Sequence, residues 1–257
     1  DSSIYSTGPS SYNIILNTNA CYNTIINNYL KAGSYKEESL TKSVSNIVVG
    51  GAHHNYIANN YLEFEDANSI YLSQWGSNYF DGGISNYNVI FNNTLKCVVV
   101  PTAWCYAIQI YGSENRVDSN RVIGAYRGIS GDDNTTIVNN VLVNLTGKDY
   151  TTYSLTGAEF GIITGSNSII QNNTIKNSVI FNSAVYGGSH STISNNHIDV
   201  SGNAHGIEAM GDDINVSDNV ISVTSGSGIY QVGKYSVLFI ANNNITATFG
   251  IGILLKK

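Results

Sequence analysis

The sequence predicts an all-β solenoid, a single-stranded parallel β-helix in which each coil contributes three short strands. Three observations predict this fold class. A unit of the form apolar-x-x-Asn-x-apolar occurs nine times, a short Gly-Ile segment recurs before the unit, and neither pattern has the 3.6-residue period of a helix. An uninterrupted repeat over 257 residues indicates one elongated domain, residues 1–257.

The unit first appears at Ile25, Asn28 and Leu30. Its later copies are centred on Asn60, Asn93, Asn120, Asn140, Asn173, Asn196, Asn219 and Asn243. Successive asparagines lie 32, 33, 27, 20, 33, 23, 23 and 24 residues apart, so the repeat has a minimum period near 20 to 24 residues, lengthened by insertions.

One unit is too short and too β-branched for a helix, so it indicates two short strands that meet at a corner formed by the asparagine. Asparagine tolerates the left-handed conformation, and its side chain can bond to nearby backbone. Stacked coils would place these side chains about 4.8 Å apart, which predicts a ladder of amides. A single unit cannot bury its apolar face, but a stack of units buries a continuous column.

A second strand signal precedes the unit. It occurs at Ile108–Gly112, Gly128–Gly131, Gly161–Gly165, Gly206–Gly211 and Gly228–Gly233. Each coil therefore has a Gly-Ile strand, a strand that ends at the asparagine and a strand that follows it. Nine to ten such coils would form a rod roughly 45 Å long.

These features resemble the right-handed parallel β-helix repeat of pectate-lyase-like, NosD-like and adhesin-like proteins, and the resemblance covers Tyr12 to Leu255. The abundance of Asn, Tyr and Ser with few Lys, Arg and Pro is most similar to adhesin-like surface proteins of methanogenic archaea. That resemblance implies an extracellular or cell-surface module that displays loops for a polysaccharide or a cell-surface glycan. It names no reaction, because fold does not fix function.

Composition excludes some partners. Only 12% of residues are charged, the net charge is −6 and the pI is about 5.2, so an acidic rod without a basic stripe is a poor nucleic-acid binder. No apolar run approaches the roughly 20 residues of a transmembrane segment. The sequence stops inside a strand signal at Gly250–Lys257, which we expect either in a domain excised from a longer surface protein or in a last strand that acts as a cap. The oligomeric state is left open.

Three cysteines fit a surface location. Cys97 and Cys105 flank one short insertion and are expected either to form a disulfide or to remain two thiols in a close turn, whereas Cys21 is expected as a small buried residue.

Four insertions interrupt the repeat: Lys31–Asn46, Ser73–Tyr87, Lys96–Trp104 and Val143–Glu159. The first three belong to consecutive coils, so we expect them to project side by side from one flank. They carry rings and a carboxylate suited to stacking on sugar faces and binding hydroxyl groups, namely Trp75, Tyr79, Phe80, Asp81 and Trp104. The alternative is that these rings fold back as cover over the coils. Tyr111 and Arg127, on the Gly-Ile strands, complete the candidate binding set.

The turn after each Gly-Ile strand carries charged residues in register. Glu114 is expected beside Asp132 or Asp133, where carboxylate oxygens could bind Ca²⁺. His190 is expected beside Asp212 or Asp213, the ingredients of an acid/base pair, with Lys234 on the far side. The alternative is an exposed row of alternating charges, worth little energetically.

Two Gly-Asp-Asp triplets invite comparison with polygalacturonases, but Asp132 and Asp212 lie three coils apart. That is about 14 Å at the usual strand spacing, too far for an inverting pair at roughly 6.5–9.5 Å.

One catalytic candidate remains on the Gly-Ile strands. Glu208 points outward if Ile207 and Ala209 point inward, with His205 at the start of the strand. Pectate-lyase-like enzymes place a base near this sheet, so the resemblance implies a lyase or epimerase hypothesis for His205 and Glu208. Such enzymes also need a cation for the uronate carboxylate, and Arg127 lies several coils away. The favoured function is thus a non-catalytic surface module, and the alternative is a polysaccharide-active lyase, epimerase or hydrolase.

Overall fold

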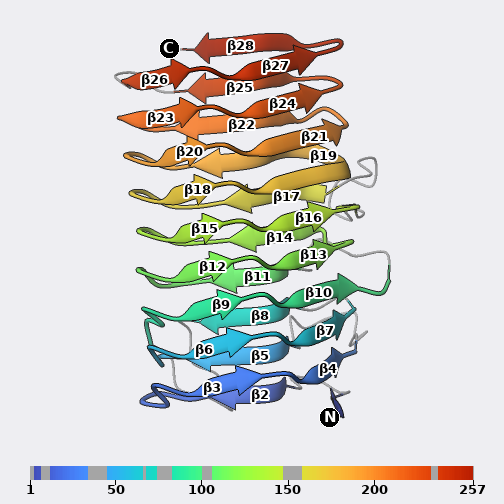
Figure 1. Ribbon diagram of the computed structural model, residues 1–257, viewed down its shortest axis with the longest axis vertical. Helices are drawn as coiled ribbons and strands as arrows, with labels where there is room; N and C mark the ends of the chain where they lie inside the picture. The colour runs from blue at the N-terminus through green and yellow to red at the C-terminus, as the bar shows by residue number, and fades with distance from the viewer. Residues whose placement is uncertain are drawn as a thin grey trace, which may run out of the picture.

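The computed structural model is a right-handed parallel β-helix, drawn in Figure 1 as a rod with the N-terminus at the bottom and the C-terminus at the top. It describes residues 3–6, 12–33, 45–65, 68–73, 83–99, 106–146, 158–232 and 237–256. All strand pairings among these residues are parallel, so every coil runs in the same direction, and the predicted fold class is confirmed.

The strands form three rows along the rod. The Gly-Ile row is β2 (Tyr12–Leu16), β5 (Ser45–Gly50), β8 (Asn68–Ser73), β11 (Tyr106–Ile110), β14 (Arg127–Ser130), β17 (Ala158–Ile163), the second half of β19 (Thr174–Gly187), β22 (His205–Met210), β25 (Ser227–Val232) and β28 (Ile251–Lys256). The entry row ends at the ladder asparagines and is β3 (Thr24–Ile26), β6 (Tyr56–Ala58), β9 (Val89–Phe91), β12 (Arg116–Asp118), β15 (Thr136–Val138), β18 (Ile169–Gln171), β20 (Thr192–Ser194), β23 (Ile214–Ser217) and β26 (Leu238–Ala241). The exit row follows them and is β1 (Ser3–Ser6), β4 (Tyr29–Ala32), β7 (Tyr61–Phe64), β10 (Thr94–Cys97), β13 (Arg121–Ile123), β16 (Val141–Val143), the first half of β19, β21 (His197–Ser201), β24 (Val220–Val223) and β27 (Asn244–Ala247).

The core is a set of apolar columns parallel to the rod axis. In the entry row, the paired residues Ile57, Ile90 and Val117 have no exposed surface. In the exit row, Leu62 and Leu95 pair and are equally buried. Each apolar position of the repeat therefore packs on its equivalents in the coils above and below, as a solenoid requires.

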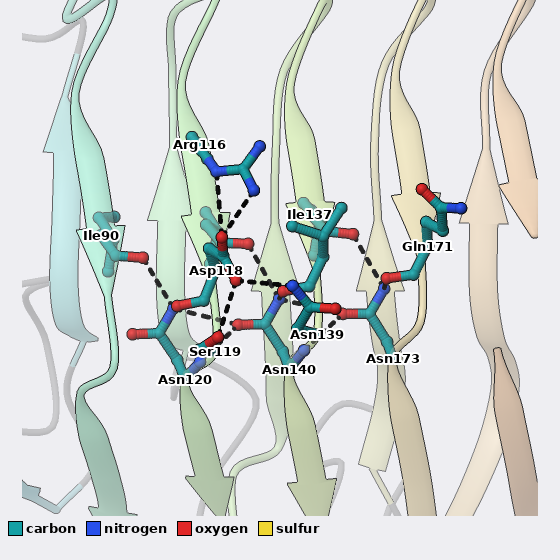
Figure 2. Close-up of polar contacts among 12 residues, drawn as sticks. Ile90, Arg116, Asp118, Ser119, Asn120, Ile137, Asn139, Asn140, Gln171 and Asn173 are labelled. Atoms are coloured by element: carbon teal, nitrogen blue, oxygen red, sulfur yellow. Dashed lines mark hydrogen bonds and ion pairs between the residues drawn. The ribbon is translucent and has the colours of Figure 1, made fainter. Parts of the chain in front are cut away.

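The predicted asparagine ladder is present. Asn120 donates from Nδ2 to Oδ1 of Asn140 at 3.0 Å, and Asn140 donates to Asn173 at 3.0 Å, as Figure 2 shows. The backbone N–H of each ladder residue donates to the same oxygen of the next one, at 2.8 Å between Asn120 and Asn140. The ladder runs through Asn28, Asn60, Asn93, Asn120, Asn140, Asn173, Asn196, Asn219 and Asn243.

The left-handed corner lies one residue earlier than expected. The ladder asparagine does not take the positive φ angle; the residue before it does, for example Asn59 at 56° and Asn92 at 50°. The reason is the ladder itself, because the N–H of its asparagine must point along the rod axis toward the next Oδ1. Ser119 and Asp218 also occupy this position, so side chains other than asparagine are accepted there.

A second ladder, which was not predicted from the sequence, stands at the other end of the entry row. Asn23, Asn55, Asn88 and Asn115 are linked from Nδ2 to Oδ1 at 3.0 to 3.2 Å. In later coils hydroxyl groups replace the amides, because the backbone N–H of Thr135 donates to Ser168 Oγ. The signal was available, since each of these asparagines precedes a ladder asparagine by five residues.

The insertions leave the rod at two different corners, so the expectation that the first three share one flank is wrong. Residues 34–44 and 100–105 connect the exit row to the Gly-Ile row, whereas residues 74–82 follow β8 and lead to the entry row. The described residues to which these segments attach therefore lie at opposite edges of the Gly-Ile row. The strands also extend into all four predicted insertions, since β4 reaches Ala32, β8 reaches Ser73, β10 reaches Cys97 and β17 begins at Ala158.

Cys97 is buried in β10, with Sγ 3.4 Å from the carbonyl oxygen of Val99, and Cys105 lies outside the described residues. The two alternatives expected for Cys97 and Cys105, a disulfide or two thiols in a close turn, therefore stay predictions. Cys21 is a half-buried thiol. No helix with the length and hydropathy of a membrane span occurs in the described part of the chain.

Candidate functional site

The outward side of the Gly-Ile row carries rings interleaved with charged groups, and we call it the Gly-Ile face. Within β22 the side chains of Ile207 and Ala209 are fully buried while Glu208 is half-buried, so the predicted outward direction of Glu208 is confirmed. The face includes Tyr71, Tyr106, Tyr111, Arg127, Phe160, Ser183, Tyr186, His205, Glu208 and Tyr230.

His205 is fixed by two contacts. Its Nδ1 accepts a hydrogen bond from the backbone N–H of Ser227 at 3.1 Å, and its ring stacks on Tyr230 with centroids 4.1 Å apart. An imidazole that accepts at Nδ1 carries its proton on Nε2 when neutral. Nε2 of neutral His205 is therefore a hydrogen-bond donor. It can bind an oxygen atom of a ligand, but it cannot accept a proton as a general base.

Glu208 lies in register with Tyr186 in the preceding coil and with Tyr230 in the following one. Its Oε2 accepts a hydrogen bond from the hydroxyl of Ser183. Burial raises the pKa of the Tyr186 phenol, and the nearby Glu208 carboxylate raises it further. Tyr186 thus stays a neutral donor beside a carboxylate acceptor, a combination that recognises hydroxyl groups.

Arg127 lies at the middle of the Gly-Ile face, and its guanidinium binds two neighbouring side chains. It pairs through Nε with Glu159 and donates from Nη1 to the hydroxyl of Tyr106 at 2.8 Å. Its Cζ also lies 4.7 Å from the centre of the Tyr106 ring, within cation–π range. Glu159 neutralises this cation, so the face gains an ordered planar group without a net positive charge.

Tyr111 joins the face through a short polar chain. Gln109 donates from Nε2 to the hydroxyl of Tyr111 at 3.0 Å, and the rings of Tyr71 and Tyr111 meet edge to face at 6.1 Å. Burial raises the pKa of Tyr71, so its hydroxyl also remains protonated at neutral pH. The structure thus brings Tyr111 and Arg127 to one face, as two members of the predicted binding set.

The rest of the predicted binding set, Trp75, Tyr79, Phe80, Asp81 and Trp104, lies outside the described residues, as does Lys234. Their contact with a sugar stays a prediction.

The carboxylates proposed for Ca²⁺ do not converge. Arg116 pairs with Thr136 in the neighbouring coil. Glu114 lies two residues before Arg116, and Asn134 lies two residues before Thr136, so Glu114 aligns with Asn134 instead of Asp132 or Asp133. Asp132 accepts a hydrogen bond from the backbone N–H of Gly112 at 3.1 Å, and Asp133 accepts one from Ser166 at 2.6 Å. Among the described residues no group of three His, Cys, Asp or Glu is placed to hold a metal ion. These two carboxylates act as caps for backbone amides of adjacent coils.

His190 lies beside Asp213 as predicted, with Nδ1 3.4 Å from Oδ2. More than half of each side chain is exposed, so water and salt screen the pair. His53 and His54, in the same turn row, have their Nδ1 atoms 2.8 Å apart, and His54 stacks between Tyr22 and Tyr87. Exposed rings also stack on the exit row, where the centroids of Tyr29 and Tyr61 lie 5.6 Å apart. Such stacks consume the ring faces that a sugar would need.

Comparisons with known proteins support the fold. The family model described as right handed beta helix region matches residues 143–257. The chain is similar to the Streptococcus pneumoniae surface protein and adhesin PfbA, with a TM-score of 0.60, 11% identity, and coverage of 99% of this chain and 85% of that one. A second structure of this surface adhesin gives a TM-score of 0.50, 12% identity, and coverage of 90% and 70%.

The A-module of the Azotobacter vinelandii mannuronan C-5 epimerase AlgE4 aligns with a TM-score of 0.34 and 13% identity over 99% of this chain and 86% of that chain, too weak a likeness to carry an argument. No curated protein sequence matches the chain. At these identities the likenesses establish a right-handed β-helix and leave its function to the site.

Proposed function

We propose that this chain is a cell-surface, adhesin-like module without catalytic activity, which binds a glycan through the Gly-Ile face and the insertions anchored at its edges. The observation that carries the proposal is that polar side chains of the face are held in place by hydrogen bonds, an ion pair and ring contacts with their neighbours. Arg127 is held by Glu159 and Tyr106, and His205 by Ser227 and Tyr230. A pre-organised surface loses little side-chain entropy when it binds.

The chemistry of the face favours a glycan without carboxylate groups. Among the described residues of the face, Arg127 is paired with Glu159, Glu208 adds a further negative charge, and Lys256 lies at the C-terminal end with Nζ 5.6 Å from the centre of the Tyr230 ring. Half-buried tyrosines provide hydroxyl donors and ring surface for the C–H faces of sugars. The similarity in fold to a bacterial surface adhesin supports the same class of function.

A binding assay with immobilised neutral and uronate-rich polysaccharides tests the proposal. Arg127→Gln should release the Tyr106 hydroxyl and weaken glycan binding at least tenfold. Arg121→Gln is the matched control, because Arg121 is exposed on the exit row, away from the Gly-Ile face. Equal binding by both variants would contradict the assignment of the face.

The loops have their own test. Trp75 and Trp104 are the two tryptophans of the chain, so ligand contact at the insertions should change the intrinsic tryptophan fluorescence. Trp75→Ala and Trp104→Ala would then divide the signal between the two insertions. Binding without any fluorescence change would restrict the contact to the Gly-Ile face.

The enzyme alternative rests on one observation, the proximity of the Glu208 carboxylate to His205, which raises the pKa of that histidine against the lowering effect of burial. It predicts ultraviolet absorbance from elimination or new reducing ends from hydrolysis when the protein is incubated with polysaccharides. The non-catalytic proposal predicts neither. If the wild type releases either product, and Glu208→Gln abolishes that activity but still binds the polysaccharide, the non-catalytic proposal is overturned.

A further inference from the structure

Two adjacent histidines turn toward each other at one corner of the rod. His53 and His54 follow β5 and precede Asn55 of the second ladder, in the turn that joins the Gly-Ile row to the entry row. Their Nδ1 atoms lie 2.8 Å apart, and their ring planes stand at 79°. Neighbouring side chains of a strand point to opposite sides. The left-handed conformation of His54, with φ 57°, breaks this alternation and brings both rings to the same side of the turn.

The pair comes from the residues of this coil, since the same turn conformation recurs along the rod. The position of His54 has a positive φ in each described coil that carries this turn, at Tyr22, Tyr87, Glu114, Asn134, Asn167, His190 and Asp213. The position before it is occupied by Cys21, Asn86, Ser113, Asp133, Ser166, Ser189 and Asp212. Among these described turns, that of His53 and His54 alone places two imidazoles side by side.

Aromatic neighbours hold the His54 ring in place. It stacks between Tyr22 and Tyr87, with centroids 5.0 Å away on each side and ring planes tilted by 26° and 24°. His53 meets the Tyr22 ring edge to face at 6.0 Å. Stacking covers the two faces of the His54 ring and leaves its edge, which carries the nitrogens, open. His54 is exposed and His53 is half-buried, so an ion from solution reaches both. Rings that are ordered beforehand lose little entropy when they bind.

The separation of the two nitrogens fits a shared metal ion. Imidazole nitrogens bind divalent transition metals such as Ni²⁺, Cu²⁺ and Zn²⁺. Two nitrogens that bind one ion at about 2.0–2.1 Å lie about 2.8–3.0 Å apart at a right angle and about 3.3–3.4 Å apart at the tetrahedral angle. The observed 2.8 Å therefore matches the right angle, which is typical of Ni²⁺ and Cu²⁺.

We propose that His53 and His54 bind one divalent transition-metal ion, of the Ni²⁺ or Cu²⁺ type, through their Nδ1 atoms. Without the ion, one Nδ1 carries a proton and donates it to the other. The ion takes the place of this proton, which moves through solvent to Nε2 of the same ring, so both imidazoles stay neutral. No third His, Cys, Asp or Glu of the described chain joins the pair, so water completes the coordination.

Titration of the whole, untagged chain with Ni²⁺ in a calorimeter tests the proposal. Ni²⁺ is the probe because the three cysteines of the chain can reduce Cu²⁺. One ion should bind per chain. His53→Ser and His54→Asn introduce residues that other coils use at the same positions, for example Ser113 and Asn134. Each variant keeps a single imidazole, so each should weaken Ni²⁺ binding by about tenfold or more.

His190→Asn is the matched control. His190 occupies the same turn position with the same φ of 57°, but its partner is Asp213 instead of a second imidazole. This variant should bind Ni²⁺ like the wild type. Thermal melts provide a second measurement, because Ni²⁺ should raise the melting temperature of the wild type and of His190→Asn more than that of His54→Asn.

Three results would overturn the proposal. The first is a wild type that does not bind Ni²⁺. The second is equal binding by the wild type, His53→Ser and His54→Asn, which would reduce the contact to a hydrogen bond between two imidazoles. The third is tighter binding of Zn²⁺ than of Ni²⁺, which would contradict the right-angle geometry. None of these results depends on what the Gly-Ile face binds.

Discussion

The backbone N–H of Ser227 donates a hydrogen bond to Nδ1 of His205, one coil away, at 3.1 Å. Burial lowers the pKa of His205 below its ordinary 6.5, Glu208 raises it in opposition, and Lys256 lowers it further. Protonation at Nδ1 would place two N–H groups head to head. The contact therefore holds only while His205 is neutral.

This relationship predicts a pH dependence of stability. Between the folded and unfolded pKa values of His205, the unfolded chain binds the proton more readily than the folded chain. The free energy of unfolding should therefore fall as the pH drops below 6.5 and level off below the folded pKa. Thermal melts of the wild type and His205→Gln should converge at acid pH.

His190→Gln is the control, because the ring of His190 is largely exposed and its Asp213 contact is screened. It should follow the wild-type profile. Parallel melting curves for wild type and His205→Gln at every pH would contradict the role given to the Ser227 contact.

Asp118 predicts a second loss of stability on acidification, at lower pH than that of His205. Burial by itself raises its pKa, but hydrogen bonds from Asn139, Arg116 and Ser119, together with the Arg116 charge, outweigh burial and lower the pKa below its ordinary 3.8, in the network of Figure 2. The stabilising contribution of the carboxylate is complete above 3.8 and is lost as the pH falls through the folded pKa.

Asp118→Asn should cost about 1–3 kcal/mol in the free energy of unfolding at neutral pH. Urea unfolding at neutral and acid pH measures both the cost and its pH dependence. The difference in the free energy of unfolding between Asp118→Asn and the wild type should shrink at acid pH. Asp199→Asn changes an exposed carboxylate of β21 and should be nearly neutral. A constant difference across pH would show that the charge of Asp118 is not the source of the effect.

The ladder predicts a large effect of a single amide. Asn196 accepts from the N–H of Asn173 at 2.9 Å and donates to the carbonyl of Ile170 and to Asn219 Oδ1, both at 3.0 Å. Asn196→Ala leaves several buried groups without partners and should cost about 3 kcal/mol or more. Chemical denaturation measures it.

The adjacent Asn195 is a matched control, since it is exposed and contributes its left-handed conformation, φ 56°, instead of a ladder amide. Asn195→Ala should cost about 1 kcal/mol. Similar costs for the two variants would mean that the ladder adds nothing beyond local backbone preference.

The glycines of the Gly-Ile row predict a contrast within one column. A Cβ at Gly206 would lie 2.4 Å from Ile221 Cγ2 and 2.6 Å from the carbonyl oxygen of Gly228. Gly206→Ala should therefore destabilise the protein by about 1–3 kcal/mol. Two coils further on, Gly252 has nothing within 4 Å of its Cβ position, so Gly252→Ala should change stability by about 0.5 kcal/mol or less. A comparable loss in both variants would point to backbone conformation instead of crowding.

The fold was predictable because one residue type marks the same corner in every coil. Asn60 and Asn93 lie 33 residues apart, yet their side chains form a direct hydrogen bond. Equivalent positions of the repeat in the sequence are therefore neighbours in the structure. The second ladder was harder to see because its amides give way to Thr135, Ser168 and Ser191, which share only a hydroxyl group.

The site was less predictable, because a turn can shift its side chains by one residue without changing the strands. Glu114 and Asn134 both have positive φ, and that position sets the register which separates Glu114 from Asp132. The side-chain contacts on the Gly-Ile face join residues that are far apart in the sequence, such as Arg127 and Glu159, and no sequence motif marks these pairs. His190 and Asp213 were predictable because 23 residues, one uninterrupted coil, separate them.

The ladder gives the rod a direction and a unit of growth. Because each amide oxygen receives hydrogen bonds from the coil before it, a coil fits only in one orientation and only as a complete turn. Genetic duplication or loss of such a turn would change the reach of the protein in increments of about 4.8 Å while every remaining layer keeps its neighbours' chemistry. Length is thus a trait that selection can adjust separately from the surface the molecule presents.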